Sequence, residues 1–132
     1  MDIPQNTIVA VVDGENFNVY RNTGNSVNIE LQPMRDHDSV DVPSDSGRSS
    51  SAANPAAKQM EEDAFGKGVT EKLNRMVLEN RVEKLIIIAA PRSLGEMRRS
   101  YHSELQKVLI GEIDKTLTGA SPEEIAKAIE SA

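Results

Sequence analysis

The stretch Lys84–Arg98, KLIIIAAPRSLGEMR, decides how this chain is expected to fold. Within it, Leu85–Ala90 is an unbroken apolar run rich in β-branched residues, which is typical of a strand buried on both faces of a sheet. Pro91 ends the run, and Ser93 with Glu96 forms an S-x-x-E capping box that predicts the start of a helix. A buried strand that leads into a capped helix places the helix N-terminus at the carboxyl edge of the sheet, where open α/β sheets tend to hold ligands.

Apolar patterning predicts further strands and helices on both sides of this stretch. Alternating or unbroken apolar residues indicate the strands, and turn residues, first at Asp13–Asn16, separate the early ones. The predicted strands are Thr7–Val12, Phe17–Arg21, Val27–Gln32, Lys84–Ala90 and Val108–Ile113. The predicted helices are Gln59–Asn80, Leu94–His102 and one that follows a second capping box at Ser121 and Glu124. The order β-β-β-α-β-α-β-α predicts a single α/β domain over residues 1–132, with a mixed sheet that begins as an antiparallel meander.

Composition limits the classes of function. The chain of 132 residues has a net charge of −6, which disfavours broad binding to a nucleic-acid backbone. It contains no Cys, so disulfides, thiolate metal sites and a Cys nucleophile are excluded. Its first residues, MDIPQNT, lack a signal-peptide pattern, and its longest apolar run is too short to cross a bilayer. We therefore expect a cytoplasmic protein without a membrane span.

The segment at about 33–58 differs in kind from the rest of the chain. It is rich in small, polar and acidic residues and has no apolar period. Such a composition cannot bury enough apolar surface to fold alone, so we expect a mobile loop. The segment is also long enough to serve as a recognition arm for a partner.

Two groups of motifs resemble a known family. The sequence AAPRSLGEMR at 89–98 is followed by IDKTLTG at 113–119 and EEI at 123–125, and this pattern resembles the bacterial host-attachment protein family. These are small proteins described as required for attachment to host cells. VVDGENFNVYRN at 11–22 resembles the first hairpin of the family, and DAFGKGVTEKLN at 63–74 resembles its long central helix. The resemblance covers nearly the whole chain.

That family in turn resembles the middle domain of the archaeo-eukaryotic peptide-chain release factor. The resemblance implies a ribonuclease-H-like layout, with a mixed five-stranded sheet and helices on its faces. The release factor acts on the peptidyl-tRNA ester through a Gly-Gly-Gln tip, whereas this chain has no Gly-Gly dipeptide. We therefore expect a non-catalytic module, monomeric and without a cofactor, that binds RNA, the ribosome or a protein partner and is linked to host attachment.

The predicted helix start carries a candidate anion site. Arg92 and Ser93 stand at this helix end, and Arg98 follows about one and a half turns later. Free N–H groups and guanidinium groups together favour phosphate or another anion. The alternative is that Ser93 only caps the helix, while the arginines are solvated or pair with Glu96.

A second candidate site is acidic. A ribonuclease-H-like layout invites a search for carboxylates that could hold catalytic metal ions, and Asp13 and Asp114 are available. They would support the alternative function, a metal-dependent hydrolase that acts on an RNA or nucleotide ester. Asp-Gly is also a strong turn signal, so Asp13 has a structural interpretation as a turn former.

Overall fold

Two strands without an exposed residue form the middle of the sheet. The structure, a computed structural model, describes residues 1–34 and 55–132. In it, β1 (Ile8–Val12) pairs in parallel with β4 (Leu85–Ala89), and every residue of both strands is buried. Their β-branched side chains suit a pleated surface that is covered on both faces. The predicted buried strand after Lys84 is therefore confirmed.

Three further strands complete a mixed five-stranded sheet. They are β2 (Phe17–Asn22), β3 (Leu31–Pro33) and β5 (Leu109–Ile113), and the strand order is β3-β2-β1-β4-β5. The pairs β1/β2 and β2/β3 are antiparallel, and β4/β5 is parallel. The predicted antiparallel meander at the start of the chain is confirmed.

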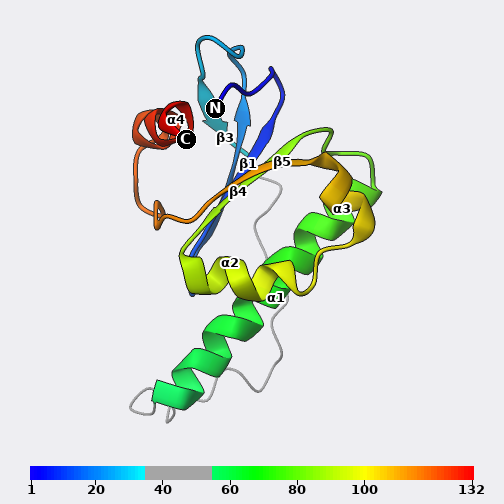
Figure 1. Cartoon of the computed structure of the whole chain (residues 1–132), viewed down its shortest axis with the longest axis vertical. Coiled ribbons are helices and arrows are strands. Elements are labelled where there is room, and N and C mark those ends of the chain that lie inside the picture. The colour runs from blue at the N-terminus through cyan, green and yellow to red at the C-terminus, as the bar shows by residue number, and fades with distance from the viewer. Residues whose placement is uncertain (35–54) are drawn as a thin grey trace.

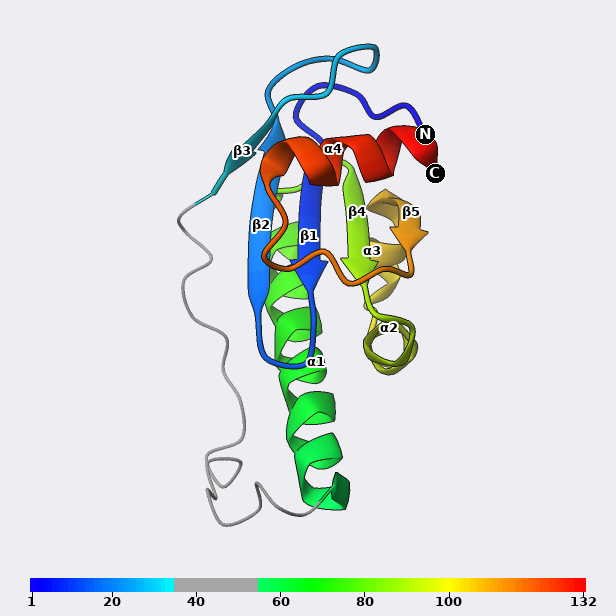
Figure 2. The same ribbon diagram turned by 90° about the vertical axis from the view of Figure 1, so that its left-hand side faces the viewer.

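Helices cover both faces of the sheet (Figures 1 and 2). One face packs against α1 (Pro55–Leu78), α2 (Pro91–Arg98) and α3 (Ser103–Val108), and the other packs against α4 (Pro122–Ser131). Because successive strand residues point to opposite faces, the two apolar cores draw on alternate positions of the same strands. The α1 side takes Ile8, Ala10, Leu85 and Ile87, whereas the α4 side takes Val9, Val11, Ile86 and Ile88.

The result is one small α/β domain of the predicted class. Figure 2 shows α1 extending beyond the sheet, and both figures place the two chain ends side by side at α4. The nitrogen of Met1 donates hydrogen bonds to the carbonyl groups of Ile129 and Ala132 there. Within the described part of the chain, no helix has the length and apolar character needed to cross a membrane.

The predicted third strand is wrong in position. Val27–Gln32 was expected to be extended, but β3 begins only at Leu31, and Val27 is 89% exposed. The buried side chain of Asn22 explains the difference, because its Oδ1 atom accepts hydrogen bonds from the N–H groups of Gly24 and Glu30. These bonds hold residues 23–30 in a loop where a strand ladder was expected.

The helices after β4 also differ from the prediction. One helix was expected over Leu94–His102, but α2 ends at Arg98 and a second short helix, α3, was not predicted. The side chain of Asn74 on α1 stabilises the break, since it donates to the carbonyl of Ser100 and accepts from the N–H of His102. The observed order is therefore β-β-β-α-β-α-α-β-α.

The observed ends of α1 and α4 can be compared with the predicted ones. At α4 the capping box of Ser121 and Glu124 is present, as predicted, with both of its reciprocal hydrogen bonds. The first helix begins earlier than predicted, at Pro55, because Pro is well suited to the first turn. The ends of the expected loop at 33–58 are thus wrong, since Pro33 belongs to β3 and 55–58 to α1, and its middle, 35–54, lies outside the described residues.

The substitution Ile87→Asp tests the buried centre of the sheet. Ile87 is fully buried, so a carboxylate there would have no partner and would cost about 3–5 kcal/mol. This is comparable with a total stability of roughly 5–15 kcal/mol, so we expect no cooperative unfolding transition in circular dichroism. Val27→Asp is the matched control and should unfold like the wild type. A soluble, cooperatively folded Ile87→Asp variant would contradict the architecture.

Candidate functional site

The carboxyl ends of β1 and β4 meet at one edge of the sheet. Asp13 directly follows β1, and α2 begins two residues after the end of β4. From this edge the chain turns from β1 to β2 on one side, whereas β5 lies on the other side of β4. The carboxyl edge of an open α/β sheet is where such proteins tend to bind ligands.

The start of α2 has no side-chain cap. Ala90 is the N-cap residue, Pro91 opens the helix, and Ser93 lies inside the first turn. The predicted capping box of Ser93 and Glu96 is therefore wrong, because Pro91 allows the helix to begin three residues earlier than predicted. Without a cap, the positive end of the helix dipole is available to a partner.

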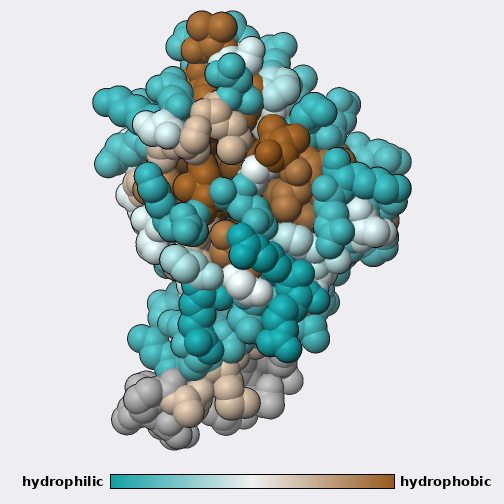
Figure 3. Space-filling model, in the orientation of Figure 1, coloured by the Kyte–Doolittle hydropathy of each residue, from teal (hydrophilic) through white to brown (hydrophobic). Residues whose placement is uncertain are grey.

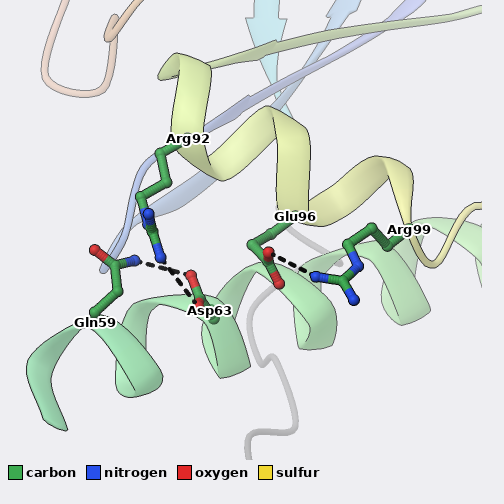
Figure 4. Close-up of polar contacts among 5 residues, drawn as sticks. All are labelled: Gln59, Asp63, Arg92, Glu96 and Arg99. Atoms are coloured by element: carbon green, nitrogen blue, oxygen red, sulfur yellow. Dashed lines mark hydrogen bonds and ion pairs between the residues drawn. The ribbon is translucent and has the colours of Figure 1, made fainter. Parts of the chain in front are cut away.

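Arg92 lies beside this helix end and reaches towards α1 (Figure 4). Its Nη2 atom is 3.6 Å from Oδ2 of Asp63, which also accepts a hydrogen bond at Oδ1 from Gln59. The Arg92 side chain is 64% exposed. A separation of 3.6 Å is too long for a direct hydrogen bond, and an exposed pair of this kind contributes little to stability. The guanidinium group is thus accessible to a stronger acceptor.

Arg98 has a different partner on a different element. Its Nε and Nη2 atoms donate to Oε1 of Glu112 on β5, at 3.0 and 2.7 Å. Burial of Glu112 opposes its charged form, but hydrogen bonds from Arg98 and Tyr101 outweigh this effect and lower the pKa of the carboxyl group. The structure therefore brings Arg92 and Ser93 together at the start of α2 and ties Arg98 to β5.

The sites predicted from the sequence did not include Tyr101 and Glu112. The Tyr101 hydroxyl donates to Oε2 of Glu112 at 2.7 Å, and burial together with this bond raises the pKa of Tyr101. A carboxylate inside the apolar run VLIGEI is the signal that could have pointed to a buried partner. Glu96, the alternative partner considered for Arg92 and Arg98, pairs instead with Arg99, at 3.3 Å.

Asp13 acts as the turn former that its Asp-Gly sequence suggests. Its Oδ1 atom accepts hydrogen bonds from the N–H groups of Glu15 and Asn16, at 2.7 and 2.6 Å, and its Oδ2 atom accepts from the Thr118 hydroxyl. Burial alone would raise the pKa of Asp13, but these hydrogen bonds, that from Thr118 foremost, lower it. Asp13 therefore carries its charge at neutral pH.

Asp114 does not share this environment. Asp114 is exposed and directly follows β5. It is not among the residues that bond to the Asp13 carboxylate, which are Glu15, Asn16 and Thr118. Among residues 1–34 and 55–132, no three His, Asp or Glu side chains are grouped so that they could hold a metal ion. In the described structure, Asp13 and Asp114 therefore do not form part of a carboxylate cluster that could hold a metal ion.

A comparison with known families shows which class of protein this fold belongs to. The model of the bacterial archaeo-eukaryotic release factor family 12 matches residues 6–129. This span covers all five strands and nearly all of α4, so the chain belongs to that family. A comparison with curated proteins found no match. The predicted relation to release factors is confirmed at the level of the family, whereas the name of host-attachment proteins is not part of this match.

The substitution Tyr101→Phe tests the clamp that Tyr101, Glu112 and Arg98 form between α2 and β5. Loss of the hydroxyl removes a part-buried hydrogen bond to a charged group, so we expect the free energy of unfolding to fall by about 1–2 kcal/mol. Urea unfolding followed by circular dichroism measures this.

The matched control is Tyr20→Phe. The Tyr20 hydroxyl has no hydrogen-bond partner within the described residues, so its loss should change the free energy of unfolding by much less. Equal effects of the two substitutions would show that the bond to Glu112 adds nothing.

Proposed function

We propose that this protein is a non-catalytic binding module that acts in translation and engages RNA or the ribosome. The family match over residues 6–129 carries the proposal, because release factors act on the ribosome and the match extends over the whole sheet. The mixed sheet with helices on both faces supports the ribonuclease-H-like layout that the motif resemblance implies.

Absence of the release-factor tip argues against hydrolysis of peptidyl-tRNA. The sequence contains no Gly-Gly dipeptide, so it cannot form a Gly-Gly-Gln tip. The metal-dependent hydrolase alternative is not part of the proposal, because both carboxylate oxygens of Asp13 already accept hydrogen bonds. Binding without chemistry is the function that remains.

The start of α2 is the proposed contact for RNA phosphate. The first-turn N–H groups around Ser93 and the exposed guanidinium of Arg92 offer donors and positive charge together. Figure 3 shows hydrophilic side chains over α2, whereas hydrophobic ones gather higher on the same face. Because the chain carries a net charge of −6, this contact must be focal and sensitive to salt.

Asp63 would compete with RNA phosphate for the guanidinium group of Arg92. Its carboxylate is the only partner of Arg92 that the described residues provide, and it would repel an incoming phosphate. RNA must therefore displace a weak ion pair, which lowers its affinity without blocking the site. A role in translation also places the protein in the cytoplasm, and we propose that any link to host attachment is an indirect consequence of that role.

Two substitutions of opposite sign test the contact. Arg92→Ala should weaken binding of a short single-stranded RNA roughly tenfold, the effect of losing one charge-assisted hydrogen bond. Asp63→Asn should tighten it, because the competing charge is gone. Titrations followed by the amide signals of Ser93 and Glu96, at two salt concentrations, measure both effects.

Arg75→Ala is the matched control, since it removes the same charge from an exposed position on α1. It should leave the affinity nearly unchanged. Equal weakening by Arg92→Ala and Arg75→Ala would mean that RNA responds to the net charge of the protein and not to a contact at Arg92. A wild-type titration without any shift at Ser93 or Glu96 would overturn the proposed contact.

A further inference from the structure

A polar pocket opens at the same edge of the sheet, next to the turn after β1. It has a volume of 410 Å³ and is lined by Asp13, Asn16, Asn18, Thr118 and Gly119. The first three belong to the β1–β2 hairpin, and the last two belong to the loop between β5 and α4. Figure 2 shows this loop crossing the ends of β4 and β1 on its way to α4. The pocket is therefore built from segments about a hundred residues apart, joined by the bond from Thr118 to Asp13.

Asn18 lines this pocket with a side-chain amide that has no hydrogen-bond partner within the described residues. It lies opposite Val11 in the β1/β2 ladder, so its side chain is on the same face of the sheet as Val11, the face that packs against α4. The side chain is half-buried. An amide has two donor hydrogens and one acceptor oxygen, and those of Asn18 line the open pocket, where a ligand can bond to them. A ligand in the pocket would satisfy them.

The rest of the lining is held in position and carries a charge. Thr118 bonds to Oδ2 of Asp13, and Gly119 has a φ of +86°, a backbone conformation that glycine adopts without strain. Asp13 is ionised at neutral pH, and its hydrogen bonds lower its pKa below the ordinary value. Oδ1 of Asp13 already accepts from two backbone N–H groups, and Oδ2 accepts from Thr118 and, at 3.3 Å, from the side-chain amide of the exposed Asn16. A ligand hydroxyl would displace that amide and donate to Oδ2 in its place.

The lining residues exclude several classes of ligand. No Lys or Arg lines the pocket and Asp13 is negative, so a phosphate would be repelled. A single carboxylate whose two oxygens are already bonded is a poor site for a divalent cation. No apolar side chain lines it, so a flat base would find no surface on which to stack. What remains is a neutral ligand that both donates and accepts hydrogen bonds.

We propose that this pocket binds the vicinal diol of a ribose-type sugar. One hydroxyl would donate to Asp13 and the neighbouring one would accept from the Asn18 amide, with Asn16 at the rim. The volume is sufficient for a sugar, and the base of a nucleoside would extend out of the pocket, which offers it no stacking surface. The diol occurs in free nucleosides and at the 3′ end of RNA, so this site does not depend on the phosphate contact at α2.

Titration with paired ligands tests the chemistry of the wild-type pocket. Adenosine and D-ribose, at millimolar concentrations, should shift the amide signals of Asn18, Thr118 and Gly119 in a saturable way. 2′-Deoxyadenosine lacks the diol and should not. No saturable shift with adenosine, or equal shifts with its deoxy analogue, would overturn the proposal whatever RNA does at α2. A short RNA with a 3′-terminal diol is compared with adenosine and with the same RNA ending in a 3′-phosphate. If the diol RNA binds more tightly than both, the ligand is an RNA end. If it binds no more tightly than adenosine, the ligand is a free nucleoside.

Asn18→Ala tests the residue assignment. It should weaken adenosine binding about tenfold, because the ligand loses its amide partner. Asn28→Ala, on the exposed loop after β2, is the matched control and should bind like the wild type. Thermal unfolding of both variants should match the wild type, since neither side-chain amide has a hydrogen-bond partner in the described structure. Equal affinity of the two variants for adenosine would overturn the assignment to Asn18.

Discussion

The parallel pairing of β1 with β4 is the constraint on which the rest of the structure depends. Both strands are apolar on both faces, so each face must be covered, and α1 and α4 do this from opposite sides. Because the strands run in parallel, their carboxyl ends meet at one edge. That edge therefore receives the turn at Asp13, the start of α2 and the loop that carries Thr118. The positions of both candidate sites follow from the one strand pair.

Local signals predicted most of the fold, although the capping box predicted at Ser93 is wrong because the helix already begins at Pro91. Features that depend on distant partners were not predicted. The apolar run at Leu85 and the capping box at Ser121 are complete within their own segments, and both predictions are confirmed. The third strand and the break before α3 are set by side chains that bond to backbone groups elsewhere. Asn22 bonds to Glu30 eight residues on, and Asn74 bonds to a helix break 26 and 28 residues away. No periodicity in the sequence reports such bonds.

The same distinction applies to the sites. Arg92 and Arg98 are equivalent in the sequence, but Asp63 on α1 and Glu112 on β5 give one an exposed, weak partner and the other a close one. The diol pocket needs the loop at Thr118 to lie against the turn at Asp13, which only the fold provides. The two proposed sites lie at one edge of the sheet, so together they would recognise RNA by its phosphate and its ribose.

Native-state hydrogen exchange tests the central claim about β1 and β4 most directly. If the rest of the structure depends on this pair, the amides of Val9, Val11 and Ile87 exchange only by global unfolding. Their opening free energies then equal the free energy of unfolding from denaturant titration, whereas those of β3 and the end of α4 are lower. Exchange of the β1 and β4 amides at a lower opening free energy than the amides of α1 would contradict the account.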